Sequence, residues 1–98
     1  MIIKKIENKF YEYSKGVEFQ IQPLRFSTVN LDAVTDSVKE QFEYCLMGWK
    51  GLTDENDEEF KYNEENKTFL YDYYKDVREF VFKIVNEIQA ELDGDLKN

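Results

Sequence analysis

Large apolar side chains recur every three or four residues towards the end of this 98-residue chain. The seven positions of this stripe are Val77, Phe80, Val81, Ile84, Val85, Ile88 and Leu92. This spacing places them on one face of a helix, so the sequence predicts an amphipathic helix over about residues 75–92. Burial of such a face contributes on the order of 10 kcal/mol before chain entropy is subtracted. The helix therefore requires a surface to pack against.

Strict alternation of apolar and polar residues predicts a half-buried strand over residues 17–22. Its apolar positions are Val17, Phe19 and Ile21. Residues 14–16 (Ser-Lys-Gly) supply a turn before it, so a β-hairpin is expected over about residues 4–22. Pro23 cannot donate a hydrogen bond to a strand ladder and marks the end of the hairpin.

A second helical stripe predicts a helix over about residues 31–47, with Ser27 or Asn30 as its N-cap. The stripe consists of Leu31, Val34, Val38, Phe42, Cys45, Leu46 and Trp49. Gly48 and Gly51 are expected to end this helix, since glycine is common just past a helix C-terminus. Cys45 belongs to the apolar face and is interpreted as a buried core residue without a disulfide partner.

An acidic loop is expected over residues 52–62, and Asn63 is a suitable N-cap for a helix over about residues 64–73. No proline separates this segment from the helix at 75–92, so one bent helix and two helices both remain open. Residues 93–95 (Asp-Gly-Asp) are expected to end the last helix. The sequence thus predicts a single α+β domain over residues 1–98, with an N-terminal β-hairpin packed on two or three α-helices.

Negative charge is concentrated in one segment of the chain. The whole sequence has 21 acidic and 13 basic residues, a net charge of -8, whereas residues 54–65 alone hold seven acids and one lysine. Nucleic acids and anionic membranes would repel such a segment, so neither is an expected partner. With no signal peptide and no apolar run of about 20 residues, we expect an intracellular soluble protein.

The sequence contains no histidine, which removes the commonest general base and the commonest transition-metal ligand. The sequence also matches an EF-hand calcium-binding loop only in part. Asp54, Asn56, Glu58 and Glu65 match four positions of an EF-hand window, but Glu59 stands where the loop needs glycine. We therefore predict no catalytic residues, no cofactor and no metal site.

Residues 48–66 follow a distinctive order of residue types. A helix ending in Gly-Trp is followed by Lys-Gly, an aliphatic residue, an acidic turn, a short strand that contains a phenylalanine, and Glu-Asn opening a helix. These are Gly48, Trp49, Lys50, Gly51, Leu52, residues 54–59, Phe60, Glu65 and Asn66, with Pro23 and Leu24 closing a strand upstream. This order resembles the small tail assembly chaperones of long-tailed bacteriophages. The chain departs from that pattern at residues 56–59, where a glycine and a proline are expected, and at Asn63, where the family more often has serine.

The resemblance implies a noncatalytic phage or prophage protein acting in the cytoplasm of a bacterial host. Such a chaperone would coat the hydrophobic tape measure protein and help recruit tail tube subunits. On this hypothesis the partner contacts are Trp49, Phe60, Tyr71 and Tyr74. Residues 77–92 would form either core or a seam for a homo-oligomer. Trp49 can instead be a structural plug that closes one end of a small core.

Two other functions compete with the chaperone hypothesis. A small acidic protein can mimic nucleic acid and inhibit a host defence complex, as anti-CRISPR and anti-restriction proteins do. Such mimicry requires carboxylates spread along a surface, whereas here they cluster in one loop. The third alternative is an enzyme that uses calcium or carboxylates alone.

Overall fold

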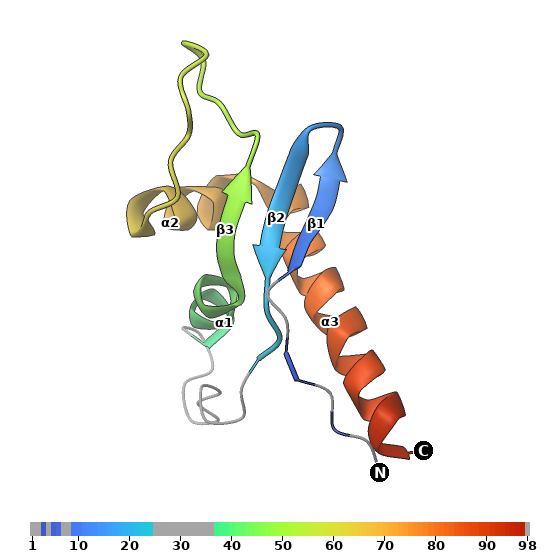
Figure 1. Cartoon of the computed structure of the whole chain (residues 1–98). Helices are drawn as coiled ribbons and strands as arrows, with labels where there is room; N and C mark the ends of the chain where they lie inside the picture. The colour runs from blue at the N-terminus through green and yellow to red at the C-terminus, as the bar shows by residue number, and fades with distance from the viewer. Residues whose placement is uncertain (1–2, 4, 7–8, 25–36, 98) are drawn as a thin grey trace.

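The structure, a computed structural model, describes residues 3, 5, 6, 9–24 and 37–97. A three-stranded antiparallel sheet packs with three helices in a single domain, which confirms the predicted α+β class (Figure 1). The elements in chain order are β1 (Lys9–Ser14), β2 (Val17–Ile21), α1 (Ser37–Cys45), β3 (Leu46–Lys50), α2 (Glu64–Tyr73) and α3 (Lys75–Lys97).

The predicted β-hairpin is confirmed as β1 and β2. Tyr11 pairs with Phe19 across the two antiparallel strands, and Gly16 occupies the turn with a φ of +82°. Phe19 and Ile21 are fully buried, as the alternating pattern indicated. The first strand begins at Lys9, and residues 4, 7 and 8 of the expected hairpin lie outside the described part of the chain.

The helix expected over residues 31–47 ends earlier than predicted, at Cys45, and Leu46–Lys50 forms β3 instead. β3 pairs antiparallel with β2, whose second edge would otherwise leave backbone groups unpaired. This long-range pairing overrides the helical spacing of Leu46 and Trp49. The prediction that Gly48 and Gly51 end the helix is therefore wrong, because Gly48 lies within the strand. The expected N-cap and the start of the helix fall in residues 25–36, outside the described residues.

The C-terminus of α1 leaves carbonyl groups that have no partner within the helix. Gln22, which follows β2, satisfies two of them. Its backbone N–H donates to the Cys45 carbonyl at 3.0 Å, and its side-chain Nε2 donates to the Tyr44 carbonyl at 2.8 Å. The end of the hairpin therefore also fixes the end of α1.

Two further side chains, one in α2 and one just before it, donate hydrogen bonds to the carbonyls of Glu43 and Leu46, which flank Tyr44 and Cys45. The buried Lys67 amine donates to the Glu43 carbonyl at 2.8 Å, and the Tyr62 hydroxyl donates to the Leu46 carbonyl at 2.7 Å. A protonated amine is also favourable beside the negative end of the helix dipole. The chain can thus turn from α1 directly into β3 without leaving these polar groups unpaired.

α3 supplies one wall of the core, as its apolar stripe predicted. The helix lies diagonally behind the hairpin in Figure 1, and four of its stripe residues are buried against the sheet and the other helices. The remaining stripe residues Phe80, Ile88 and Leu92 are half-buried. The buried core consists of Phe19, Ile21, Phe42, Cys45, Leu46, Leu70, Val77, Val81, Ile84 and Val85.

Cys45 is confirmed as a core residue. Its side chain is fully buried, and burial raises the pKa of the thiol to about 12. The reactive thiolate is therefore a very small fraction of the residue near neutral pH.

The segment after the acidic loop forms two helices rather than one bent helix. Tyr74 separates them with a φ of -115° and a ψ of 83°, and Arg78 Nη1 donates to the Tyr71 carbonyl at 3.1 Å. Asn63 is confirmed as the N-cap of α2, because its side chain accepts the Asn66 N–H at 2.7 Å. α3 continues through Gly94 to Lys97, so the prediction that residues 93–95 end it is wrong. A single glycine costs a helix about 1 kcal/mol but does not oblige it to end.

Among the described residues, no helix is both long enough and apolar enough to cross a membrane.

Gly51 lies just past β3 and has a φ of +84°, a left-handed conformation that glycine adopts without strain. A Cβ at this position would overlap the backbone carbonyl of Gly16 in the β1–β2 turn. The chain leaving β3 can pass directly against the hairpin turn only because residue 51 has no side chain. This approach sets the starting point of the acidic loop.

Replacement of Gly51 by alanine should lower the free energy of unfolding by about 3 kcal/mol, since left-handed strain and a displaced backbone add together. Gly16→Ala is the matched control, because Gly16 has a similar φ of +82° but no atom within 4 Å of the added Cβ. That control should lose only about 1 kcal/mol. Urea unfolding of both variants measures the difference, and equal losses would contradict the proposed close contact.

Lys67→Met should destabilise the fold by about 2–3 kcal/mol, because it removes a buried charged donor and leaves the partly buried Glu43 carbonyl without this hydrogen bond. The exposed Lys61→Met is the control and should change stability by less than about 0.5 kcal/mol. Chemical denaturation near neutral pH gives both values. A similar, small loss in both variants would show that Lys67 does not hold α1 and α2 together.

The stabilisation from Lys67 should also depend on pH. Burial by itself lowers the pKa of its amine, but the side-chain hydrogen bond with Tyr62 and the charge of Glu64 outweigh burial and raise this pKa above 10.5. A raised pKa in the folded state means that the contribution is complete below the unfolded pKa and is lost as pH rises through the folded one. The stability gap between the native protein and Lys67→Met should therefore stay constant up to about pH 9 and shrink above about 10.5.

Candidate functional site

The acidic loop projects beyond the sheet next to the β1–β2 turn (Figure 1). Its shape is held by hydrogen bonds within the loop, both between backbone groups and to the Asp54 side chain. Asp54 Oδ1 accepts the N–H groups of Asn56 and Glu58 at 2.8 and 3.0 Å, and the Phe60 N–H donates to the Leu52 carbonyl at 2.9 Å. These bonds close a small hairpin that returns the chain to the body of the protein at Phe60.

The geometry of this loop bears on the calcium window considered from the sequence. The Asp54 carboxylate already accepts two backbone N–H groups, and Glu65 lies in the first turn of α2. Within the part of the chain that the structure describes, no group of three or more His, Cys, Asp or Glu side chains could hold a metal ion. The loop therefore gives no support for a cation site.

An unbroken series of aromatic contacts runs from β3 through the loop to the end of α2, and we call it the aromatic ladder. Trp49 stacks on Phe60 at a centroid distance of 5.7 Å, and its Nε1–H donates to the Phe60 carbonyl at 2.6 Å. Phe69 lies 6.3 Å from Phe60 and 6.0 Å from Tyr74. The full ladder consists of Tyr62, Trp49, Phe60, Phe69, Tyr73 and Tyr74.

The solvent side of this ladder is hollowed into a groove of about 580 Å³, which we call the aromatic groove. Four segments meet around it: the end of β1, the acidic loop, α2 and the start of α3. Its lining residues are Tyr13, Leu52, Thr53, Asp54, Glu55, Phe60, Phe69, Leu70, Tyr74 and Val77. Most of the lining is apolar, and the acidic residues Asp54 and Glu55 are also part of it.

The aromatic side chains around the groove are unusually exposed for their size. Phe69 is 44 % exposed, Tyr74 is 51 % exposed and Tyr73 is 74 % exposed. Large apolar groups left in water and gathered on one surface are typical of protein contact sites.

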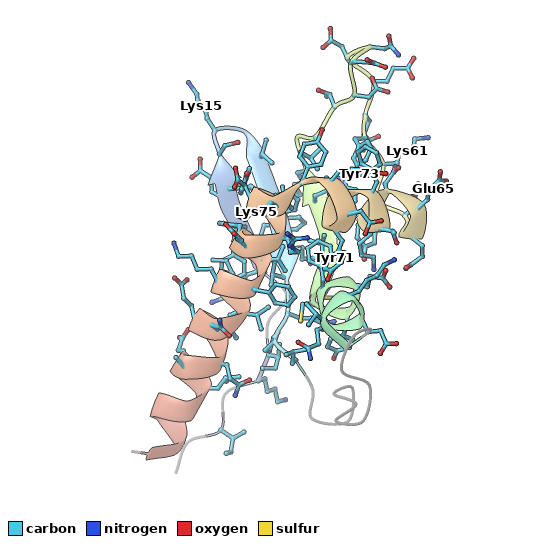
Figure 2. All side chains as sticks on the ribbon, turned by 180° about the vertical axis from the view of Figure 1, so that it is seen from behind. Lys15, Lys61, Glu65, Tyr71, Tyr73 and Lys75 are labelled. Carbon is cyan, nitrogen blue, oxygen red and sulfur yellow. The ribbon has the colours of Figure 1, made fainter. Side chains whose placement is uncertain are left out.

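The structure brings together three of the four residues predicted from the sequence. Phe60 and Tyr74 line the aromatic groove, and Trp49 stacks behind Phe60 as its support. Tyr71 lies elsewhere. Its ring is half-buried and lies 5.3 Å from Phe42 in the core, on the side of α2 opposite Tyr73 (Figure 2).

Sequence reasoning missed Phe69, Tyr73 and Tyr13 as members of this surface. Phe69 and Tyr73 are four residues apart, so helical spacing alone could have placed them on one face of α2. Tyr13 comes from the hairpin, where its ring packs edge-on against Phe80 at 5.2 Å. No local signal relates Tyr13 to a helix more than 50 residues later.

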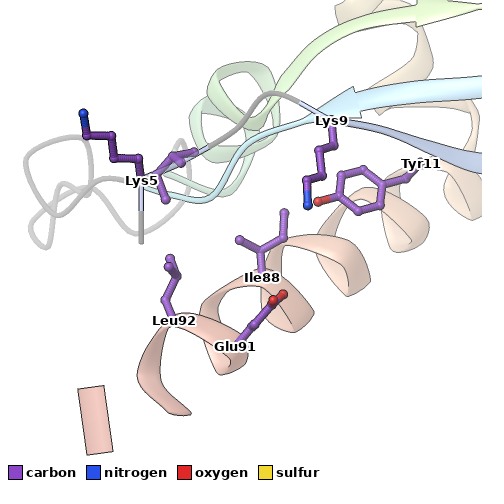
Figure 3. A pocket seen from close by; sticks show the side chains of 7 residues that line it. Lys5, Lys9, Tyr11, Ile88, Glu91 and Leu92 are labelled. Atoms are coloured by element: carbon purple, nitrogen blue, oxygen red, sulfur yellow. The ribbon is translucent and has the colours of Figure 1, made fainter. Parts of the chain in front are cut away.

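A second hollow, of about 350 Å³, lies between the N-terminal segment, β1 and the last turns of α3 (Figure 3). Lys5, Lys9 and Glu91 contribute charged groups to it, and Tyr11, Ile88 and Leu92 contribute apolar ones. Lys9 and Glu91 each already take part in an interaction within the chain. The aromatic groove is larger, more apolar and contains two of the predicted contact residues, so it is the candidate functional site.

The side chains that line the groove are of types that can bind apolar and cationic groups. The groove presents aromatic rings and carboxylates but has neither a histidine nor a cysteine in its lining. Comparison with protein-family models, with curated proteins and with solved structures finds no match to this chain.

Replacement of Trp49 by phenylalanine should keep the ring stacking on Phe60 but remove the N–H donor to its carbonyl. We expect a loss of about 1 kcal/mol in stability and faster amide hydrogen exchange at Phe60, whose N–H bonds to Leu52. Hydrogen exchange followed by NMR measures this at single residues. Unchanged exchange at Phe60, with β3 intact, would show that Trp49 does not position the groove wall.

Proposed function

We propose that this chain is a noncatalytic tail assembly chaperone of a long-tailed phage, which binds the tape measure protein and helps recruit tail tube subunits. The observation that carries the proposal is the exposed aromatic groove, because a soluble domain gains nothing in its own stability by leaving Phe69, Tyr73 and Tyr74 in water. A chaperone uses such a surface to cover apolar segments of a partner. The motif at residues 48–66 supports the proposal independently.

The motif lies beside the groove, although Gly48 and Trp49 belong to β3 and not to the end of a helix, and Phe60 lies outside the strands. Its Gly-Trp-Lys-Gly half forms β3 and the close contact at Gly51, and its acidic half forms the projecting loop. Trp49 and Phe60 from the two halves stack on each other at the base of the groove. The same residues that carry the family resemblance therefore build the candidate binding surface.

Inhibition of a host defence complex by mimicry of nucleic acid remains a prediction from the sequence, and it is the weaker alternative. Mimicry of a duplex needs carboxylates spaced along a surface in the manner of phosphates. Here Asp54, Glu55, Asp57, Glu58 and Glu59 all belong to one short loop. Such a cluster favours local pairing with a basic group over the tracking of a long groove.

Co-expression with a tape measure protein tests the chaperone proposal. We expect a several-fold larger soluble fraction of the partner with the native chain, and a loss of that gain with Phe69→Ser. Val38→Ser is the matched control, because Val38 is 43 % exposed on α1, outside the groove, and Phe69 is 44 % exposed. This control should preserve the gain. A tape measure protein equally insoluble with and without the native chain would refute the proposal.

A further inference from the structure

We propose that the aromatic groove takes a protein segment with a particular chemistry: two or three large apolar side chains next to arginine or lysine residues. This inference rests on the proposed chaperone function and specifies which part of a partner the groove selects. It follows from the apolar floor of the groove and from the acidic residues of the loop that complete its lining.

The floor of the groove sets the apolar part of the segment. Phe60, Phe69 and Tyr74 present ring faces and edges, and Leu70 and Val77 close the bottom of the groove as buried core residues. A hollow of about 580 Å³ falls within the size range that holds a drug-sized ligand, so it has room for a few side chains. Apolar side chains gain most by entering it, because every ring they cover leaves water.

The carboxylates set the charge of the rest of the segment. Asp54 and Glu55 belong to the lining of the groove, and Asp57, Glu58 and Glu59 follow in the same loop. The one cationic residue between positions 54 and 65 is Lys61. A partner that places basic groups beside this loop finds complementary charge, while an acidic segment or a phosphate backbone would be repelled.

The two features also divide the work of recognition. Apolar burial in the groove supplies most of the affinity, whereas the exposed carboxylates act through screened attraction and favour segments that carry basic groups. Binding should therefore depend on both the apolar and the basic residues of the segment.

A titration of the full chain with synthetic peptides tests the inference. The probe is a short peptide in which two leucines and a phenylalanine precede three arginines, without tryptophan. Trp49 is the single tryptophan of the chain and stacks on the groove residue Phe60, so its fluorescence reports binding. The comparison peptides have glutamates in place of the arginines, or serines in place of the apolar residues.

We expect the basic apolar peptide to bind at least about tenfold more tightly than each comparison peptide, with weaker binding as salt is raised. Phe69→Ala should weaken it about tenfold. Glu55→Gln should weaken it about two- to fivefold and reduce the salt dependence. Glu87→Gln, on the outer side of α3, should leave affinity unchanged. Equal binding of the acidic peptide, or no effect of Phe69→Ala, would overturn the inference.

The failure of this inference can be distinguished from failure of the proposed function. If the peptides do not bind but co-expression still solubilises the tape measure protein, the chemistry assigned to the segment is wrong and the chaperone function stands. If the basic peptide binds as expected but co-expression has no effect, the groove has the stated preference and the tail assembly role is wrong.

Discussion

The fold depends on four consecutive carbonyl groups at the point where α1 turns into β3. These are the carbonyls of residues 43–46, at the end of α1 and the start of β3. All four accept hydrogen bonds from donors distant in the sequence. Gln22 comes from the end of the hairpin, Tyr62 from the loop and Lys67 from α2. Unpaired carbonyls at this partly buried junction would cost up to about 1–3 kcal/mol each. The junction therefore ties together the hairpin, α1, β3, the loop and α2.

The same junction determines where the candidate site can form. Because α1 ends at Cys45, the chain has the length to add β3 to the free edge of β2, and Gly51 then brings it against the hairpin turn. The acidic loop starts there and returns at Phe60, which stacks on Trp49. A helix that continued through residue 47 would carry Trp49 away from the loop, and the aromatic ladder would be lost.

The groove itself is a consequence of how small the core is. The fully buried side chains come from β2, α1, β3 and α3, while Leu70 and Lys67 are the buried residues of α2. Its other side carries Phe69 and Tyr73 into solvent beside Tyr74. An apolar surface that the chain does not cover, next to a loop of concentrated negative charge, is a selective surface for a partner with the opposite arrangement.

Local pattern by itself determined the parts of this protein that depend on neighbours in the chain. Alternation specified β2, helical spacing specified α3, and Asn63 with its acidic first turn specified the start of α2, because each is a period or cap formed within a few residues. Phe60 and Tyr74 could be named as contacts, whereas Phe69 and Tyr13 were missed. Only tertiary structure decided that Leu46–Lys50 is a strand and that Tyr71 faces the core. Those outcomes depend on partners more than 20 residues away, which supply hydrogen bonds and packing that no local periodicity contains.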